Sequence, residues 1–134
     1  MTNATKDRPF QRWNPDTIPV PLAAGANIFY GTIVALNADG LGVPGAESAG
    51  LIYAGAAKSS VDNSDGGDGD KVVHVQRSAN NAIKWVNDGS IGQEHLLKVA
   101  YILDNQTVTA TDGDGVRSAI GLVVRIEPDG VWIQ

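Results

Sequence analysis

Residues 101–134 carry the clearest fold signal of the chain and read YILDNQTVTATDGDGVRSAIGLVVRIEPDGVWIQ. Apolar and β-branched runs, which suit half-buried strands, are separated by clusters of Asp, Asn, Gly and Pro, which favour turns. Because side chains alternate along a strand, one face of 120–126 should present Ile120, Leu122, Val124 and Ile126. The stretch predicts a β-meander with tight turns at 112–115 and 127–130.

The pattern of short strands and turns continues backward through residues 18–100. The longest run is IFYGTIVAL at 28–36, which is apolar on both faces and predicts one continuous central strand. The run IPVPL at 18–22 contains two prolines, which confine it to a sheet edge or an extended crossover. Ser90 with Gln93 three residues later matches a capping box and predicts one short helical turn within 90–97.

These elements together predict an all-β fold, a small antiparallel β-barrel or sandwich, formed by a single domain over residues 18–134. The strand alternation predicts a core made of ten apolar residues: Ile28, Val34, Leu36, Leu51, Val73, Val75, Val99, Leu122, Val124 and Ile126.

Composition agrees with one turn-rich domain. The 134 residues include 16 glycines and 6 prolines, and 43% are hydrophobic, enough for a packed core. There is no cysteine, so neither disulfides nor thiolate metal sites are available. The net charge of -5 disfavours a nucleic-acid partner, since phosphate binding calls for a basic surface.

The sequence gives no signal for a membrane or for export. No apolar run approaches the ~20 residues that a membrane-spanning helix needs. Residues 1–21 lack the apolar centre of a signal peptide, so we expect synthesis in the cytoplasm without export.

Residues 1–17 differ from the rest and predict an extended N-terminal arm. They are polar and contain Pro9 and Pro15, which disfavour regular structure. Phe10 and Trp13 lie among the basic residues Arg8 and Arg12, although a disordered tail would ordinarily lack large aromatic side chains. Two interpretations follow: the aromatics fold back on their own domain, or they anchor the arm on a partner, as aromatic and arginine side chains often do.

The loop SSVDNSDGGDGDK at 59–71 invites a calcium hypothesis, because calcium prefers several oxygen ligands. Its carboxylates come from Asp62, Asp65, Asp68 and Asp70. The spacing matches neither an EF-hand loop nor a recurring calcium β-helix repeat. We therefore expect a mobile, solvated loop whose stability does not depend on metal.

The sequence offers no candidate catalytic residues. The histidines, His74 and His95, are isolated in the sequence, and there is no Gly-x-Ser-x-Gly elbow, phosphate-binding loop or dinucleotide fingerprint. Trp85 and Trp132 lie on strands, where packing is the ordinary role. The prediction is a protein without catalytic residues, metal or cofactor.

The turns and strand ends over roughly 50–134 resemble a family of small tailed-bacteriophage and prophage proteins associated with the capsid. The matching residues are VDNS at 61–64 with the Gly-rich loop to Asp70-Lys71, then Val73, Val75, Arg77, Gly92, Ala100-Tyr101, LDNQTV at 103–108, TDGDGVRSA at 111–119, Gly121 and DGVWI at 129–133. The general plan, a cysteine-free β domain after an N-terminal arm, is similar to capsid decoration (cement) proteins such as the phage lambda head decoration protein.

The resemblance implies a structural virion protein. Such a protein binds the outer capsid surface, bridges subunits of the major capsid protein, and often assembles as a trimer. Placed beside the arm, it suggests that Arg8, Phe10, Arg12 and Trp13 contact the capsid. Two alternatives stay open: a head fibre base or tail component, and, in another class, a calcium- or carbohydrate-binding module.

Overall fold

The structure is a computed structural model that describes residues 2–134, and it is nearly all β. Five strands close into a barrel in the order β10-β8-β12-β11-β9. Their bounds are β8 Ile83–Asn87, β9 Val99–Ile102, β10 Thr107–Thr109, β11 Ala119–Glu127 and β12 Gly130–Ile133. One 3₁₀ turn, η1 at Gln93–His95, joins β8 to β9. The all-β barrel fold predicted from the sequence is confirmed.

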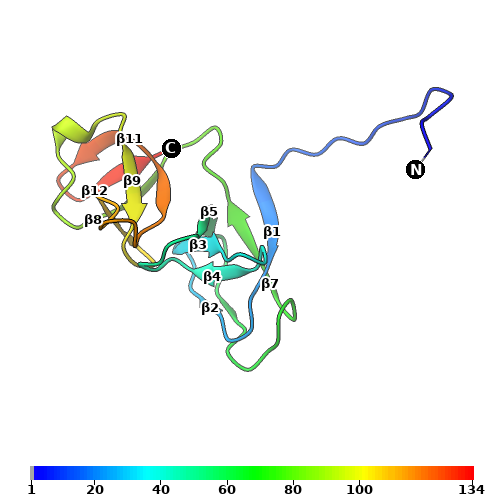
Figure 1. The fold of residues 1–134 in the computed structure, drawn as a ribbon, viewed down its shortest axis with the longest axis horizontal. Helices are drawn as coiled ribbons and strands as arrows, with labels where there is room; N and C mark the ends of the chain where they lie inside the picture. Colours follow the sequence, from blue (N-terminus) through cyan, green and yellow to red (C-terminus); the bar gives the residue numbers. More distant parts are fainter. Residues whose placement is uncertain (1) are drawn as a thin grey trace.

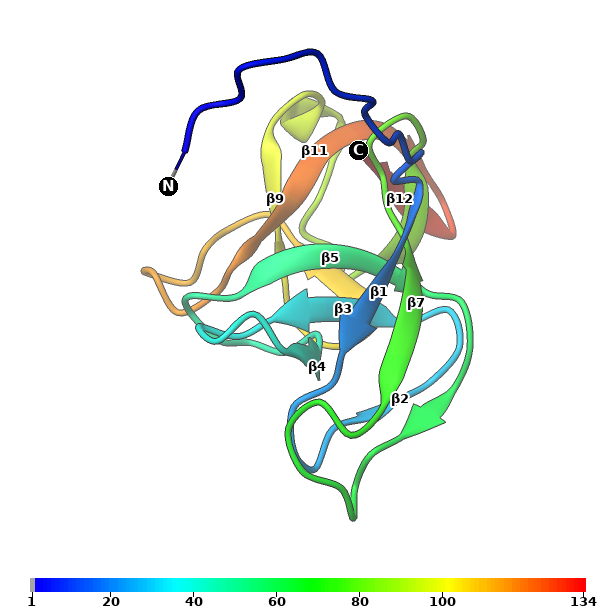
Figure 2. The same cartoon turned by 90° about the vertical axis from the view of Figure 1, so that its right-hand side faces the viewer.

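The other strands form a five-stranded sheet in the order β1-β7-β5-β3-β4 and a small two-stranded ribbon, β2-β6. Their bounds are β1 Thr17–Pro21, β2 Asn27–Ile28, β3 Ile33–Leu36, β4 Gly42–Pro44, β5 Ile52–Ala57, β6 Val61–Asp62 and β7 Val72–Gln76. Figure 1 shows the sheet between the barrel and the N-terminal arm. In Figure 2, β1 and β7 cross the direction of β3 and β5, so the sheet is strongly curved.

Two apolar clusters fill the body, and β3 contributes to both. Ile33 and Ala35 pack into the barrel core with Trp85, Ile102 and other buried residues. Val34, on the opposite face of β3, packs into the second cluster, whose members include Val20, Leu22, Ile28, Ala54, Ala57, Val73 and Val75. The sheet is therefore apolar on both faces at β3, as a central strand requires.

The predicted continuous strand at 28–36 is wrong. A turn at 29–32 separates β2 from β3, and Thr32 donates its backbone N–H and its hydroxyl to the carbonyl of Phe29. Gly31 adopts φ +80°, a left-handed conformation that breaks the extended backbone. Tyr30 is consequently 73% exposed instead of sharing a face with Val34.

The predicted meander is also wrong in its pairing. β10 pairs with β9 and, in parallel, with β8, a strand that precedes the meander in sequence. Residues 112–115 form part of a longer loop before β11, with positive φ at Gly113, Asp114 and Gly115. The turn at 127–130 is confirmed, since Glu127 and Gly130 pair at the end of the β11–β12 hairpin.

The core prediction holds for the sheet better than for the barrel. Of the ten residues, four are buried (Ile28, Val34, Val73 and Val75) and four are half-buried (Leu36, Leu51, Val124 and Ile126). Val99 and Leu122 are each 42% exposed, so their prediction is wrong. Bulges on both sides of Leu122 shift the alternation of β11, which buries Ile120 and Val123 instead.

Two smaller predictions are confirmed with one correction. β1 lies at the edge of the sheet, where Pro19 and Pro21 remove no donor from a central ladder. A helical turn does occur within 90–97, but Gly92 precedes it and Ser90 does not cap it. The Ser90 hydroxyl donates to Asp88 and accepts the N–H of Ala110 at 3.0 Å.

Candidate functional site: the N-terminal arm

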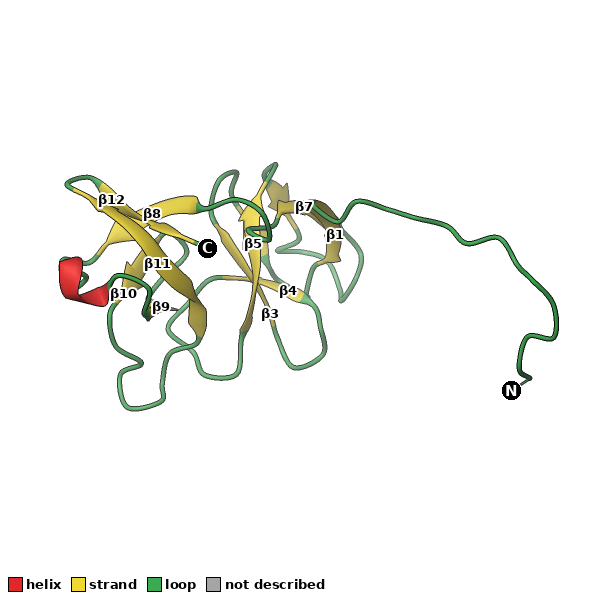
Figure 3. Ribbon diagram, turned by 90° about the horizontal axis from the view of Figure 1, so that it is seen from above, coloured by secondary structure: helices red, strands yellow, loops and turns green. Residues whose placement is uncertain are grey.

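The arm consists of residues 2–16, which form no helix or strand. Figure 3 shows it leaving the body beside β1 and running away from the barrel. Pro9 and Pro15 remove backbone donors along it, which favours an extended chain. The arm therefore presents its side chains to the surroundings and not to its own domain.

The base of the arm is fixed to the sheet at Asp16. The Asp16 carbonyl accepts the backbone N–H of Arg77 at 2.8 Å and the side-chain amide of Gln76 at 3.2 Å. Lys58 reaches the hydroxyl of Thr17, the first residue of β1, at 3.3 Å. These bonds set the direction in which the arm leaves the body.

The predicted contact residues are all exposed. Phe10 is 78% exposed and Trp13 is 66% exposed, so neither aromatic folds back on the domain. Arg8 and Arg12 are exposed, and within residues 2–134 neither forms an ion pair. The arm thus offers two apolar anchors and two free guanidinium groups, the side chains enriched at the centres of protein interfaces.

Charge is distributed unevenly between the arm and the body. Residues 2–16 hold three basic and two acidic side chains, whereas residues 17–134 hold seven basic and thirteen acidic ones. The arm is therefore the cationic end of an acidic protein. A complementary partner surface would carry negative charge beside an apolar pocket.

The loop at 59–71 uses its carboxylates to bond its own backbone. The carboxylate of Asp62 accepts the N–H of Ser64 at 2.8 Å, and that of Asp70 accepts the N–H of Gly67 at 2.8 Å. Asp68 reaches across to the N–H of Ala24 at 2.7 Å. The first two bonds lie within the loop, and the Asp68 bond ties it to the chain between β1 and β2, which counts against the expected mobility.

Asn63 is the buried centre of that loop, only 1% exposed. Its side-chain amide donates to the carbonyls of Ala23 at 2.9 Å and Gly67 at 3.1 Å. A depression of about 260 Å³ beside it is also lined by Lys71, whose ammonium would repel a cation. Within residues 2–134, no three His, Cys, Asp or Glu side chains gather where a metal ion could be held.

Replacing Asn63 with alanine should lower the free energy of unfolding by about 1–3 kcal/mol, since the two hydrogen bonds from its amide to the carbonyls of Ala23 and Gly67 are lost. The matched variant Asp65→Asn, on a side chain with no hydrogen bond in the loop, should leave stability unchanged. Thermal unfolding with and without calcium measures both effects. A calcium-dependent rise of several degrees in the wild type, lost in Asp65→Asn, would restore the calcium hypothesis.

The histidines lie apart from each other in the fold, and Trp85 packs in the barrel core. His74 is exposed on β7, whereas His95 lies on η1 at the barrel and accepts the N–H of Gly92 through Nδ1 at 3.0 Å. Trp85 is 5% exposed and packs edge-on against Tyr53, with ring centroids 6.5 Å apart. Burial raises the pKa of Tyr53. The packing role predicted for Trp85 is confirmed.

A cluster of charges surrounds the β11–β12 turn. Lys84 on β8 lies 2.6 Å from the carboxylate of Asp129 and 3.7 Å from that of Glu127, with its ammonium 5.9 Å from the ring of Trp132. The hydrogen bond from Lys84 lowers the pKa of Asp129. The indole N–H of Trp132 donates a hydrogen bond to the carboxylate of Glu127. This bond is the main cause that lowers the pKa of Glu127, and the positive charge of Lys84 lowers it further.

This cluster should make part of the stability depend on pH. A carboxyl whose folded pKa is lowered stabilises the fold above its ordinary pKa, near 4, and loses that effect as the pH falls through the folded value. Lys84→Met should therefore lower the urea midpoint at pH 7, and the difference from wild type should shrink below pH ~4. Lys6→Met on the arm is the control. An undiminished difference at acid pH would contradict the ion-pair account.

The sequence pattern did not predict one group of exposed apolar residues on the barrel. Leu97 is 67% exposed, and Val99 and Leu122, both predicted to be core residues, are exposed beside it on β9 and β11. The bulges that expose them leave no local signature in the sequence.

Comparisons of the chain with protein-family models, with curated proteins and with solved structures find no match. The relation to capsid decoration proteins therefore stays a prediction from the sequence segments quoted above. In residues 2–134 no helix is long and apolar enough to cross a membrane.

Proposed function

We propose that the protein is a structural component of a phage virion that binds the outer surface of the capsid and bridges subunits of the major capsid protein. The observation that carries this proposal is the arm, which is fixed at Asp16 and exposes Phe10 and Trp13. Two exposed aromatic side chains flanked by arginines on a projecting chain are the kind of anchors that protein interfaces use. Arg8 and Arg12 beside them fit a partner groove with acidic groups.

The energetics show what the arm must achieve. Burying two large aromatic side chains contributes about 3–6 kcal/mol. Ordering the seven residues 7–13 costs about 7–14 kcal/mol of backbone entropy. Backbone hydrogen bonds to the partner, at about 1 kcal/mol each, and the two arginines must supply the difference. An extended arm that adds to a strand edge of a capsid subunit would provide them.

Weak contacts of this kind suit a repeating shell. Several linked copies bind a symmetric lattice through several arms at once, and the effective concentration of the later contacts greatly strengthens the first. Assembly as a trimer, which the resemblance implies, would serve this purpose. The trimer is a prediction, and measuring the mass of the protein in solution would test it.

Mixing the protein with empty shells of the major capsid protein tests the proposal. We expect electron microscopy to show added density at one repeated position on the outer surface, and the coated shells to resist heat better than bare ones. Density confined to a vertex or to the tail would favour the head fibre or tail alternative. Absence of binding to any phage particle would overturn the proposal.

A further inference from the structure

Leu97 occupies a backbone position that ordinarily requires glycine. Lys98 donates its N–H to the carbonyl of His95 at 2.9 Å, which closes a turn over 95–98. Leu96 has φ -57° and ψ 130°, and Leu97 has φ 62°, so the turn is of type II with leucine at its third residue. That residue must adopt a positive φ, which favours Gly or Asn.

The same leucine is the first residue of a β-bulge. Its N–H donates to the carbonyl of Val123 at 2.7 Å, while Val123 donates back to the carbonyl of Lys98 at 3.0 Å. Two residues of one strand thus face one residue of β11, the arrangement in which a left-handed glycine is usual. Leucine here is unfavourable for the backbone and, at 67% exposure, gains little from its own core. Such outliers point to function.

Leu97 stands in a small apolar surface, which we call the barrel corner: Leu97, Val99 and Leu122. Val99 and Leu122 are directly paired between β9 and β11, and each is 42% exposed. Leu97 lies two residues before Val99 and is bonded to the residue after Leu122. Pairing and sequence thus place the three residues close together at one end of β9 and β11, and all three are partly or largely exposed within residues 2–134.

Opposite charges border the corner. Glu94 precedes the exposed leucines and Lys98 follows them, both exposed. Lys98 has no ion pair within residues 2–134. No Lys or Arg forms an ion pair with Glu94 within residues 2–134, and Nδ1 of His95, 3.7 Å from the Glu94 carboxylate, accepts the N–H of Gly92 at 3.0 Å. One unpaired charge of each sign therefore lies beside the same apolar surface.

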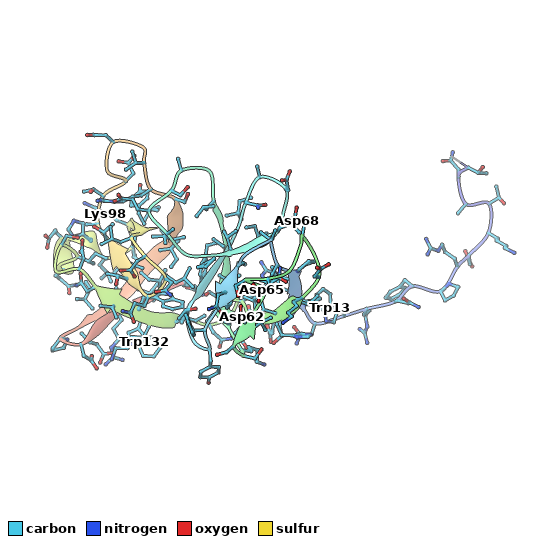
Figure 4. The ribbon with its side chains drawn as sticks, turned by 90° about the horizontal axis from the view of Figure 1, so that it is seen from below. Trp13, Asp62, Asp65, Asp68, Lys98 and Trp132 are labelled. Atoms are coloured by element: carbon cyan, nitrogen blue, oxygen red, sulfur yellow. The ribbon has the colours of Figure 1, made fainter. Side chains whose placement is uncertain are left out.

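We propose that the barrel corner is the surface through which copies of this chain associate, with Lys98 of one copy facing Glu94 of the next. A surface that carries an apolar centre and unpaired charges of both signs can meet another copy of itself, with Lys98 of each copy facing Glu94 of a neighbour, in a closed symmetric assembly. The predicted trimer is one such assembly, and the inference deepens that part of the proposed function. Figure 4 places Lys98 on the barrel, well away from Trp13, so association at the corner leaves the arms free.

Sedimentation of the full chain over a range of concentrations tests the inference. Because the corner is small, we expect reversible association in the micromolar range. Leu97→Asn should weaken it at least about tenfold, since one large apolar side chain leaves the contact. Asparagine tolerates positive φ, so the melting temperature of the dissociated variant should be equal to or above that of the dissociated wild-type chain. Val72→Thr, at an exposed apolar position on β7, is the matched control and should associate normally.

A charge exchange identifies the occupant of the corner. Glu94→Lys and Lys98→Glu should each weaken association, and the double variant should restore it, because only a second copy of the same chain changes both charges together. A wild type that stays monomeric, a Leu97→Asn variant that associates normally, or a double variant as weak as the single ones would each overturn the inference. A corner needed for shell binding but not for association would assign it to the capsid instead.

The two proposals fail separately. A monomeric protein that still coats shells contradicts the corner and leaves the proposed function standing. An oligomer that depends on Leu97 but binds no phage particle contradicts the proposed function and leaves the corner standing.

Discussion

Replacing Gly55 with alanine is expected to lower the free energy of unfolding by at least about 3 kcal/mol, enough to unfold a large part of the protein. Gly55 lies in β5 with φ +145°, and a Cβ atom there would lie 2.1 Å from the carbonyl oxygen of Gln76. That oxygen belongs to β7, the neighbouring strand, so it cannot move without separating the sheet. Urea unfolding of the purified variant, or its absence from the soluble fraction, measures the effect.

Gly50→Ala separates the clash from backbone strain alone. Gly50 also has a positive φ, +79°, but no atom lies within 4 Å of the position that its Cβ would take. We expect this variant to lose only about 1–2 kcal/mol. If both variants lose the same free energy of unfolding, the close approach of β5 and β7 is not the reason that position 55 requires glycine.

Replacing both Phe10 and Trp13 with serine is expected to weaken shell binding at least about 100-fold, given about 3–6 kcal/mol of lost burial. The melting temperature should not change, because both side chains are exposed and contribute nothing to the core. The matched control is Phe29→Ser with Tyr30→Ser, which removes two exposed aromatics from the body instead of the arm. A double arm variant that binds shells as the wild type does would remove the arm from the account.

The features predicted correctly from the sequence are those whose physical cause is local. The prolines of β1 fix its edge position, and the Pro-Asp-Gly turn at 128–130 closes the last hairpin, whatever the rest of the chain does. The arm is predictable for the same reason. Its prolines and charges exclude a strand or helix, and its aromatics stand out against that background.

The errors arose where distant residues decide the structure. Barrel closure depends on the parallel pairing of β10 with β8, which no local pattern announces. The bulges of β11 depend on its partners β9 and β12. Because of these bulges, Leu122 is exposed where strand alternation predicts a buried residue. At 28–36 the apolar side chains of Phe29 and Tyr30 led to the prediction of one strand, whereas Gly31 allows a turn there.

The same division applies to the candidate sites. Exposure of Phe10 and Trp13 could be anticipated as one of two alternatives, and the structure agrees with the exposed one. The barrel corner could not be anticipated, because the alternation of apolar residues predicts that two of its members, Val99 and Leu122, lie in the core. A strained leucine becomes visible only when its φ is known.

The central claim is that the arm of a folded β domain docks on the capsid. Electron cryo-microscopy of shells saturated with the full-length protein tests it most directly. We predict density for the β body on the outer surface and continuous density for residues 7–13 along a capsid subunit, with Phe10 and Trp13 buried against it. Bodies that are well resolved on the shell while their arms remain without density, or shells that stay bare, would contradict the account.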